Sequence, residues 1–174
     1  MDADGEIYGG INIRTVCRAG FVVAEVECIF CRIVRGEAEA YTVYKGNGVT
    51  VFLDRYPASK GHVLVVPDEH YESVHTAPPR VAAKVWLAAS AIARYYREKA
   101  GAPAVNVLTN SGRYAGQIIF HFHVHVIPRW GPPRSFWGDR HEITPREAKE
   151  VLEMLQGVGK LVETYLSELG LRVD

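Results

Sequence analysis

Residues 120–128 have the sequence Phe120-His-Phe-His-Val-His-Val-Ile-Pro128, in which histidines alternate with apolar residues. Because successive side chains of a β-strand point to opposite faces, a strand here places three imidazoles on one face and three apolar side chains on the other. The imidazoles belong to His121, His123 and His125. Neighbouring ones would lie about 6.6 Å apart along the strand. One phosphate group or one metal ion could therefore touch more than one ring.

Two other interpretations of this stretch are open. A solvent-facing strand could carry the histidines by accident, but three in strict alternation arise by chance with a probability of roughly one in a hundred. A metal site built by all three rings is the second alternative, since imidazole is a common zinc ligand. It would require His121 and His125 to converge across four residues, which is an awkward geometry.

Length and composition limit the class of protein. The chain has 174 residues, 48% of them hydrophobic, with 20 basic and 20 acidic side chains. This predicts one domain with an appendage and a sizeable core. Zero net charge argues against nucleic acid or a membrane surface as a partner. Three cysteines do not suggest a disulfide framework, and neither a secretory signal nor a membrane span is recognisable, so a cytoplasmic protein is expected.

The remaining pattern predicts an α+β fold with an antiparallel sheet of about five strands and one long central helix. Strands are expected over 41–44, 49–53, 62–67, 104–108 and 118–128. A short helical turn is expected over 28–35, and the long helix runs from Pro78 to about Lys99. Residues 1–27 form an N-terminal extension, in which 11–13 and 21–23 are compatible with a hairpin.

The C-terminal part, 131–174, is predicted to be a linker followed by an amphipathic helix packed on the domain. Thr144-Pro-Arg-Glu147 is a capping box with proline at the first helical position. A helical stripe of apolar residues continues to Leu169. Gly157 and Gly159 weaken the middle of this helix and permit a break there.

The sequence 121–127 resembles the His-φ-His-φ-His-φ-φ signature (φ, apolar) of the histidine triad (HIT) superfamily of nucleotide hydrolases and transferases. Similar motifs occur upstream in the same order, at 28–31, 61–67, 110–112 and 115–117. The resemblance implies a HIT-like fold, with residues 28–130 as a nucleotide-binding catalytic domain. It also implies a homodimer, for which the helix over 80–99 is a candidate contact.

The resemblance implies attack on the α-phosphorus of a nucleotide and a nucleotidyl-histidine intermediate. His123 matches the nucleophile, and a neutral imidazole suits this role if its other nitrogen donates a hydrogen bond. His125 and Gln117 match residues that hold the phosphate oxygens, and His121 is the first histidine of the triad. Imidazole and amide N–H groups can stabilise the negative charge of such a transition state.

The resemblance also implies a nucleotide-binding surface. Asp54 matches the acceptor of the ribose hydroxyls, since one carboxylate can accept from both. The other matching positions are His62, Asn110, Gly116, Ile29, Phe30 and Phe52. The apolar ones would line the base pocket, although ordinary core positions are an equal alternative for them. Ile118 departs from the family pattern, because many members have Ser or Thr there to assist the leaving group.

Cys28-x-x-Cys31 has the spacing of half a tetrahedral zinc site, with a redox pair or two buried thiols as alternatives. Some HIT branches hold a structural zinc with this motif, and the matching ligands here are Cys28, Cys31, His70 and His121. The resemblance therefore implies a zinc ion that is saturated by protein ligands. Such an ion would stabilise the fold and would not activate the substrate.

The sequence as a whole predicts hydrolysis of dinucleoside polyphosphates such as diadenosine polyphosphates, because Pro128-Arg129 looks like the branches active on them. A divalent cation on the polyphosphate would accompany this substrate. Arginines around the histidine strand are candidate contacts to its tail, with Arg129 the best of Arg113, Arg129, Arg134 and Arg140 and solvated side chains an equal alternative. The alternatives are an adenosine phosphoramidase, or a zinc-stabilised nucleotide-binding protein with little catalysis, which Ile118 favours.

Overall fold

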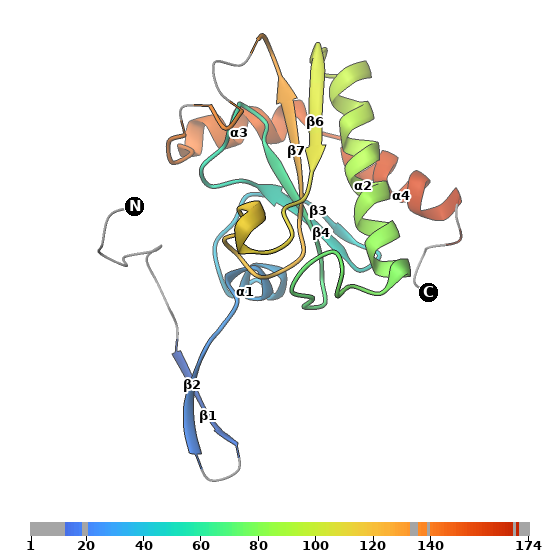
Figure 1. Cartoon of the computed structure of the whole chain (residues 1–174). Helices are drawn as coiled ribbons and strands as arrows, with labels where there is room; N and C mark the ends of the chain where they lie inside the picture. Colours follow the sequence, from blue (N-terminus) through green and yellow to red (C-terminus); the bar gives the residue numbers. More distant parts are fainter. Residues whose placement is uncertain (1–12, 19–20, 133–135, 139, 169, 171–174) are drawn as a thin grey trace.

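The structure is a computed structural model that describes residues 13–18, 21–132, 136–138, 140–168 and 170, with side chains from residue 27 onward. Its strands are β1 (Ile13–Arg18), β2 (Phe21–Val26), β3 (Thr42–Gly46), β4 (Val49–Leu53), β5 (Val63–Pro67), β6 (Ala104–Leu108) and β7 (Val124–Arg129). Its helices are α1 (Ile29–Arg35), α2 (Pro79–Glu98), α3 (Pro145–Met154) and α4 (Val158–Glu168), with a 3-10 turn, η1 (Arg113–Ala115). The predicted α+β class and the long helix are confirmed (Figure 1).

The central sheet has five antiparallel strands in the order β3-β4-β5-β7-β6. The last histidine of the triad therefore lies in an interior strand, with Leu64 opposite it on β5 and Leu108 opposite it on β6. Every residue of β7 is buried. Both faces of the sheet are covered, so this strand is buried along its whole length, with His125 set into one face.

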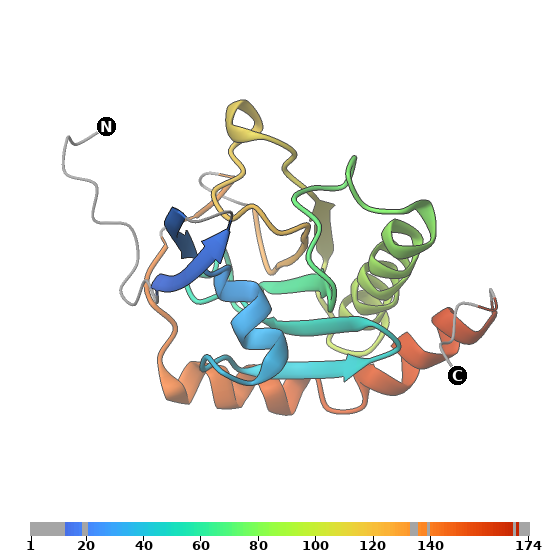
Figure 2. The ribbon, with the colours of Figure 1, turned by 90° about the horizontal axis from the view of Figure 1, so that it is seen from below.

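Helices cover the two faces of the sheet unequally (Figure 2). On one face, α1 forms a small core in which Phe30 and Val34 meet Phe52, Leu64 and Val66. On the other face, α2, α3 and α4 enclose the main core, which includes the inward residues of the strands. The alternation along each strand assigns its side chains to these two cores, as the period of a β-strand requires.

The strand predicted over 118–128 begins only at Val124, so this expectation is wrong for residues 118–123. In the register of β5 with β7, Val65 pairs with Val124, and the next residues would bring Pro67 opposite Phe122. Proline has no N–H to donate to a ladder, and β5 ends there. The N–H of Phe122 donates instead to the Tyr71 carbonyl at 2.6 Å. Two of the three histidines thus precede the strand.

The expected alternation of faces persists through this irregular segment. Phe122, Val124 and Val126 lie in the main core on the α2 side. On the opposite side, the ring of Phe30 lies within 5.9 Å of the ring of His121 and 5.3 Å of that of His123, centroid to centroid. An extended backbone keeps the period of two even without ladder hydrogen bonds.

The C-terminal stripe forms two helices, α3 and α4, and the break between them at 155–157 contains one of the two glycines that the sequence pointed to. This glycine, Gly157, has a φ of +91°, which L-residues rarely adopt, whereas Gly159 lies within α4. The predicted capping box is present between Thr144 and Glu147. Both helices bury apolar residues in the main core, namely Ala148, Val151, Val158, Val162 and Leu166.

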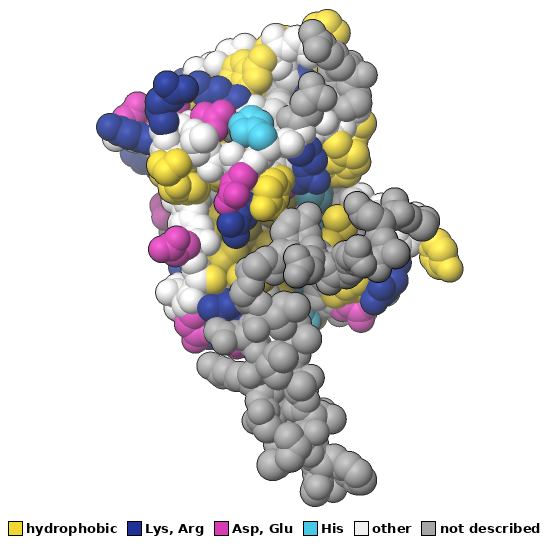
Figure 3. All heavy atoms as spheres, turned by 90° about the vertical axis from the view of Figure 1, so that its left-hand side faces the viewer, with side chains coloured by type: hydrophobic (Ala, Val, Ile, Leu, Met, Phe, Trp, Pro, Cys, Tyr) yellow, Lys and Arg dark blue, Asp and Glu magenta, His cyan; other side chains and the backbone are white. Residues whose placement is uncertain are grey.

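At the other end of the chain, β1 and β2 pair antiparallel, from Ile13 opposite Val26 to Arg18 opposite Phe21. Figure 1 shows this hairpin projecting from the body of the molecule. Residues 11–12 of the expected first strand lie outside the described residues. Within the described part of the chain, no helix has the length and apolarity needed to cross a bilayer. Basic and acidic side chains are interspersed on the face seen in Figure 3.

Candidate functional site

His123 lies immediately before β7 and is 6% exposed. Its Nδ1 is 2.7 Å from the carbonyl oxygen of His121. Because a carbonyl oxygen only accepts, Nδ1 must carry the proton, and Nε2 is left with its lone pair. Burial lowers the pKa of His123, and the hydrogen bond to the carbonyl offsets part of that effect. The ring is therefore a neutral imidazole with a fixed tautomer, which is the nucleophilic form.

His125 is oriented by a chain of hydrogen bonds. The N–H of Ala58 donates to Nδ1 of His62 at 3.1 Å, so the proton of His62 is on Nε2. That nitrogen lies 3.0 Å from Nδ1 of His125 and donates to it. His125 must then carry its own proton on Nε2. Burial, followed by the charges of His123 and Arg140, lowers the pKa of His125 to about 3, so the ring stays neutral.

The rings of His123 and His125 lie 4.8 Å apart, centroid to centroid. The first ring offers a lone pair and the second a fixed N–H donor. Together they present a nucleophile and a donor for an oxyanion side by side, which is the combination that substitution at phosphorus requires.

Asp54 follows β4 and is 7% exposed. Its Oδ1 accepts from the N–H of Tyr56 at 2.7 Å, and Nη2 of Arg140 lies 3.4 Å from Oδ1 and 3.3 Å from Oδ2. Burial raises the pKa of Asp54, while the Tyr56 N–H and Arg140 oppose this rise. Its Oδ2 is 3.4 Å from Nδ1 of His62. The structure thus brings four of the expected residues together: Asp54, His62, His123 and His125.

The side chain of Gln117 is occupied by backbone groups. Its Nε2 donates to the carbonyls of Glu72 at 2.7 Å and Ile119 at 3.1 Å, and its Oε1 accepts from the N–H of Gly112 at 2.8 Å. These bonds fix the loop between β6 and the histidine segment. Contact of Gln117 with a phosphate stays a prediction, and in this structure the residue positions the loop.

Within the same loop, Nδ2 of Asn110 donates to the carbonyl of Gly116 at 3.3 Å. Thr109, which sequence reasoning missed, donates its hydroxyl to the carbonyl of His123 at 2.6 Å. The signal that could have revealed it is the β6–β7 pairing, since Leu108 lies opposite His125 and Thr109 follows directly. Thr109 therefore supports the backbone of His123, and Asn110 holds the turn at Gly116 within the loop.

The three apolar residues that were expected to line the base pocket differ in their burial and contacts. Phe52 is 3% exposed and packs against Phe30 with ring centroids 5.2 Å apart, so it belongs to the small core under α1. Phe30 belongs to the same core and also contacts the ring of His123. Ile29 is 38% exposed on α1. A role for any of them in binding a base stays a prediction.

A second cluster lies at the other end of the histidine segment. Nδ1 of His121 is 3.5 Å from Sγ of both Cys28 and Cys31, and Nδ1 of His70 is 3.3 Å from Sγ of Cys31. The four ligand atoms all lie within 4.8 Å of one another. A tetrahedral zinc ion separates its sulfur and nitrogen ligands by about 3.6 Å. The observed spacing therefore fits a zinc ion with two cysteine and two histidine ligands.

The chemistry of this cluster also favours a cation. Nε2 of His121 lies 3.0 Å from the carbonyl of Pro67 and donates to it, which turns the Nδ1 lone pair toward the sulfurs. Burial and the neighbouring Cys28 raise the pKa of Cys31 to about 11. Two adjacent thiolates need a positive charge between them, and a bound zinc ion would supply it.

Asp54, His62 and His125 form another group whose ligand atoms lie close together. Here the nitrogens of His62 are already used, one by the Ala58 N–H and the other by His125. His121 turns toward the cysteines, whereas His125 turns toward His62. The three triad rings therefore do not converge on one ion, and this argues against the metal site built by all three rings.

Two more residues at the site come from a segment for which the sequence predicted no structure. The ring of Trp137 lies 5.5 Å from that of His125, and Arg140 reaches Asp54. Adjacent aromatic residues at 136–137, in an otherwise Pro/Gly/Arg segment, were the available signal. Arg129, expected near a polyphosphate, is 7% exposed and instead binds Oδ1 of Asn106 at 2.7 Å and the carbonyl of Phe136 at 2.5 Å.

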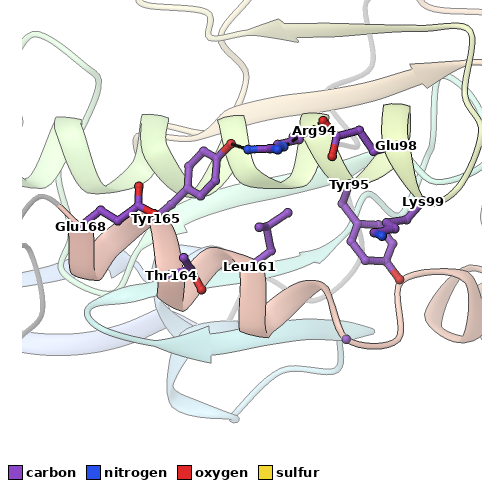
Figure 4. Close-up of a pocket in the computed structure, with 9 residues that line it drawn as sticks. Arg94, Tyr95, Glu98, Lys99, Leu161, Thr164, Tyr165 and Glu168 are labelled. Carbon is purple, nitrogen blue, oxygen red and sulfur yellow. Dashed lines mark hydrogen bonds and ion pairs between the residues drawn. The ribbon is translucent and has the colours of Figure 1, made fainter.

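A separate cavity of about 470 Å³ lies between α2 and α4, and none of its lining residues belongs to the histidine site (Figure 4). Arg94 donates to Oε1 of Glu98 at 2.9 Å and to the hydroxyl of Tyr165 at 3.3 Å. Two of the charged groups in the lining, Arg94 and Glu98, are thus paired with each other. The lining residues are Arg94, Tyr95, Glu98, Lys99, Gly157, Leu161, Thr164, Tyr165 and Glu168.

Comparison with known proteins gives one consistent result. The HIT domain matches residues 35–131. An uncharacterised HIT-like protein of Saccharolobus solfataricus is 36% identical over 131 residues, 74% of this chain and 92% of that protein. Adenylylsulfatase HINT3 of Arabidopsis thaliana is 38% identical over 103 residues, 59% of this chain and 52% of that protein. A Zn-bound histidine triad family protein from Mycobacterium smegmatis superposes with a TM-score of 0.63 at 32% identity, over 82% of this chain and 95% of that one.

Proposed function

The chain belongs to the HIT family, and on that premise we propose that it is a nucleotide hydrolase that acts at the α-phosphorus through a nucleotidyl-His123 intermediate. The observation that carries the proposal is the fixed tautomer of His123, whose Nδ1 is 2.7 Å from the His121 carbonyl. This hydrogen bond leaves Nε2 free to attack. His125, the second donor-bearing ring, lies beside it.

In the first step, Nε2 of His123 attacks the α-phosphorus and a P–N bond forms. The bond from phosphorus to the leaving-group oxygen breaks, and the leaving group departs with the electron pair. The imidazole becomes positively charged, and its Nδ1–H remains bonded to the His121 carbonyl, which stabilises that charge. The Nε2–H of His125 donates to a non-bridging phosphate oxygen.

In the second step, water attacks the same phosphorus from the side that the leaving group has left. The P–N bond breaks, its electron pair returns to Nε2 of His123, and a nucleoside monophosphate is released. One proton from the water passes to solvent. The resting tautomer is restored without any movement of the Nδ1 proton.

The substrate class that we propose first is dinucleoside polyphosphates of the diadenosine type. Ile118 is 60% exposed and has no group to donate to a leaving group. A phosphoanhydride leaves as a stable anion and does not depend on such a donor, whereas an amine leaving group must be protonated. Because Ile118 cannot protonate an amine leaving group, we place anhydrides before the adenosine phosphoramidates, which remain the alternative. A divalent cation on the polyphosphate stays a prediction.

Adenylyl sulfate is a second candidate within the same reaction type. The similarity to a protein named an adenylylsulfatase supports it, although the match spans 52% of that protein. Sulfate is also an anion that leaves without protonation, so Ile118 is equally compatible with it. The nucleophile and its activation would be unchanged.

A zinc ion held by Cys28, Cys31, His70 and His121 is part of the proposal. Such an ion would connect α1 to the residue whose carbonyl orients the nucleophile. With four protein ligands it has no open position for substrate, and its contribution is structural. The Zn-bound relative supports this assignment.

The proposal is tested by a single-turnover reaction with diadenosine tetraphosphate labelled in its adenosine groups. We expect acid-labile label on the wild-type protein and release of labelled adenosine monophosphate. His123→Ala should retain no label and lose about 10⁴-fold or more in kcat, since the covalent route is removed. His141→Ala is the matched control, because the exposed side chain of His141 pairs with Glu147 and not with a histidine of the site.

Tight binding of adenosine monophosphate, with neither label nor turnover for any anhydride, would contradict the hydrolase. That result would favour the alternative of a zinc-stabilised nucleotide-binding protein with little catalysis. Label that persists on the His123→Ala protein would show that His123 is not the nucleophile. Homodimer formation and a cytoplasmic location stay predictions, and light scattering of the purified chain checks the first.

A further inference from the structure

The described residues 136–138 and 140–143, which we call the strap, lie outside the matched HIT domain but contact its site. Trp137 places its ring 5.5 Å from that of His125. Arg140 reaches the carboxylate of Asp54, 86 positions earlier in the sequence. A segment that follows the family domain thus contributes side chains to the candidate active site.

The strap is docked on the loop that joins Asp54 to His62. Nε of Arg140 donates to the Tyr56 carbonyl at 2.6 Å, and the N–H of Ile143 donates to the Arg55 carbonyl at 2.9 Å. Gly138 has a φ of +68°, and a Cβ at this position would lie 2.5 Å from the carbonyl oxygen of Ala58. Only glycine allows so close an approach between the two backbones.

Several contacts fix the guanidinium of Arg140. Its Cζ lies 5.5 Å from the centre of the Trp137 ring, in cation–π geometry. Its Nε is held by the Tyr56 carbonyl, and its Nη2 lies between the two oxygens of Asp54, at 3.4 and 3.3 Å. The ring of Trp137 in turn packs against that of Phe136. The arginine is therefore placed in advance of any ligand.

This arrangement determines what Asp54 can do. A carboxylate that accepts hydrogen bonds from two vicinal hydroxyls has to be ionised and held in one orientation. Burial opposes ionisation, because removing a charge from water is unfavourable unless the charge is paired. Arg140 supplies the pairing charge, and together with the Tyr56 N–H it fixes the plane of the carboxylate.

We propose that Arg140 of the strap is the positioning residue for Asp54, so that any preference of the site for an intact ribose diol depends on the strap. Trp137 and Gly138 act through Arg140, the first by packing under it and the second by letting the strap dock. The inference rests on the proposed function only in assuming that a nucleotide binds with its sugar at Asp54. It does not depend on the covalent step.

The test compares the binding of adenosine monophosphate with that of its 2′,3′-dideoxy analogue by calorimetry. We expect the wild-type protein to prefer the ribonucleotide at least about tenfold. Arg140→Gln should reduce this ratio about tenfold, or abolish it, by weakening the ribonucleotide and leaving the dideoxynucleotide unchanged. A merely structural role would weaken both ligands alike and leave the ratio intact.

Two further variants distinguish the effect of strap docking from the effect of losing a positive charge. Gly138→Ala should reduce the ratio in the same way as Arg140→Gln, although neither Arg140 nor Asp54 is altered. Arg94→Gln is the matched control: its side chain pairs with Glu98 on α2, in the cavity of Figure 4 and not at the strap, and exposed pairs of this kind contribute little. We expect the wild-type ratio there.

The inference is overturned if the wild type binds both nucleotides equally, or if Arg140→Gln keeps the wild-type ratio. If neither nucleotide binds the wild type, the inference and the proposed function fail together. Selective binding without label on His123 would leave the inference standing and refute the hydrolase.

Discussion

His121 and His125 lie four residues apart, face the same side of one segment and are both buried, yet their partners differ completely. His121 precedes the paired strand, donates from Nε2 to the Pro67 carbonyl and points Nδ1 at two cysteines. His125 lies within β7 and accepts at Nδ1 from His62. One imidazole is therefore prepared to bind a cation, and the other to donate to an anion.

The difference shows that the second nitrogen of each ring sets its role. An imidazole whose Nε2 donates to a carbonyl presents a lone pair at Nδ1, and one whose Nδ1 accepts presents a proton at Nε2. His123 lies between these two residues, and its Nδ1 donates to the carbonyl of His121, which leaves the lone pair on Nε2. The backbone of His121, a ligand of the proposed zinc ion, thus orients the proposed nucleophile, which couples the two clusters.

Of the changes that distinguish the cysteine–histidine cluster from the catalytic histidines, removal of zinc should have the largest effect, and the effect should be on stability. We expect a chelator, or Cys31→Ser, to lower the free energy of unfolding by several kcal/mol, because zinc bound at structural sites contributes about 10 kcal/mol or more. Calorimetric melting and metal analysis would measure this, with one zinc per chain expected in the wild type and none in the variant.

The matched comparison is His125→Ala, which should keep its zinc and lose activity. If Cys31→Ser melts like the wild type and contains the same metal, the cluster is not a zinc site. If His125→Ala loses its zinc, the two clusters are not separable in the way that we describe.

A smaller effect is expected on the catalytic side from His62→Ala. This change removes the donor that fixes the tautomer of His125, so we expect kcat of the folded protein to fall about 10²-fold, together with a loss of stability because His62 is fully buried. His62→Gln should recover part of the loss, because its amide can still donate to His125. Equal activity of the alanine and wild-type proteins in steady-state assays would refute the hydrogen-bond chain.

The smallest effect concerns acid stability. The folded-state pKa of His125 is about 3 because of burial, whereas an unfolded histidine titrates near 6.5. Between these values the unfolded chain binds one more proton at this residue. The stability present above about pH 6.5 is therefore lost as the pH falls, by about 1.4 kcal/mol per pH unit.

Denaturant unfolding of the wild type and of His125→Gln at pH 7, 5.5 and 4.5 isolates this contribution. Both proteins keep the cysteine cluster, so its own pH dependence cancels in the difference. We expect a shallower dependence for the variant, and parallel curves would contradict the assignment.

The local pattern predicted much of the architecture. The strands 49–53 and 104–108, the helix after Pro78 and the capping box at Thr144 all agree with the structure, because each depends on neighbours in the sequence. The strand over 118–128 was predicted too long, because its length depends on a partner that ends at Pro67. The use of the Gln117 amide by backbone groups had no sequence signal.

The amino-acid order alone established which side chains share a face, where helices start, and that cysteine and histidine ligands of a zinc-site type are present. These properties follow from the period of the backbone and from residue chemistry. Folding decided which nitrogen of each histidine is free, that the paired strand starts at Val124, and that Trp137 and Arg140 reach the site. Such outcomes depend on contacts between residues tens of positions apart, whose formation no local period encodes.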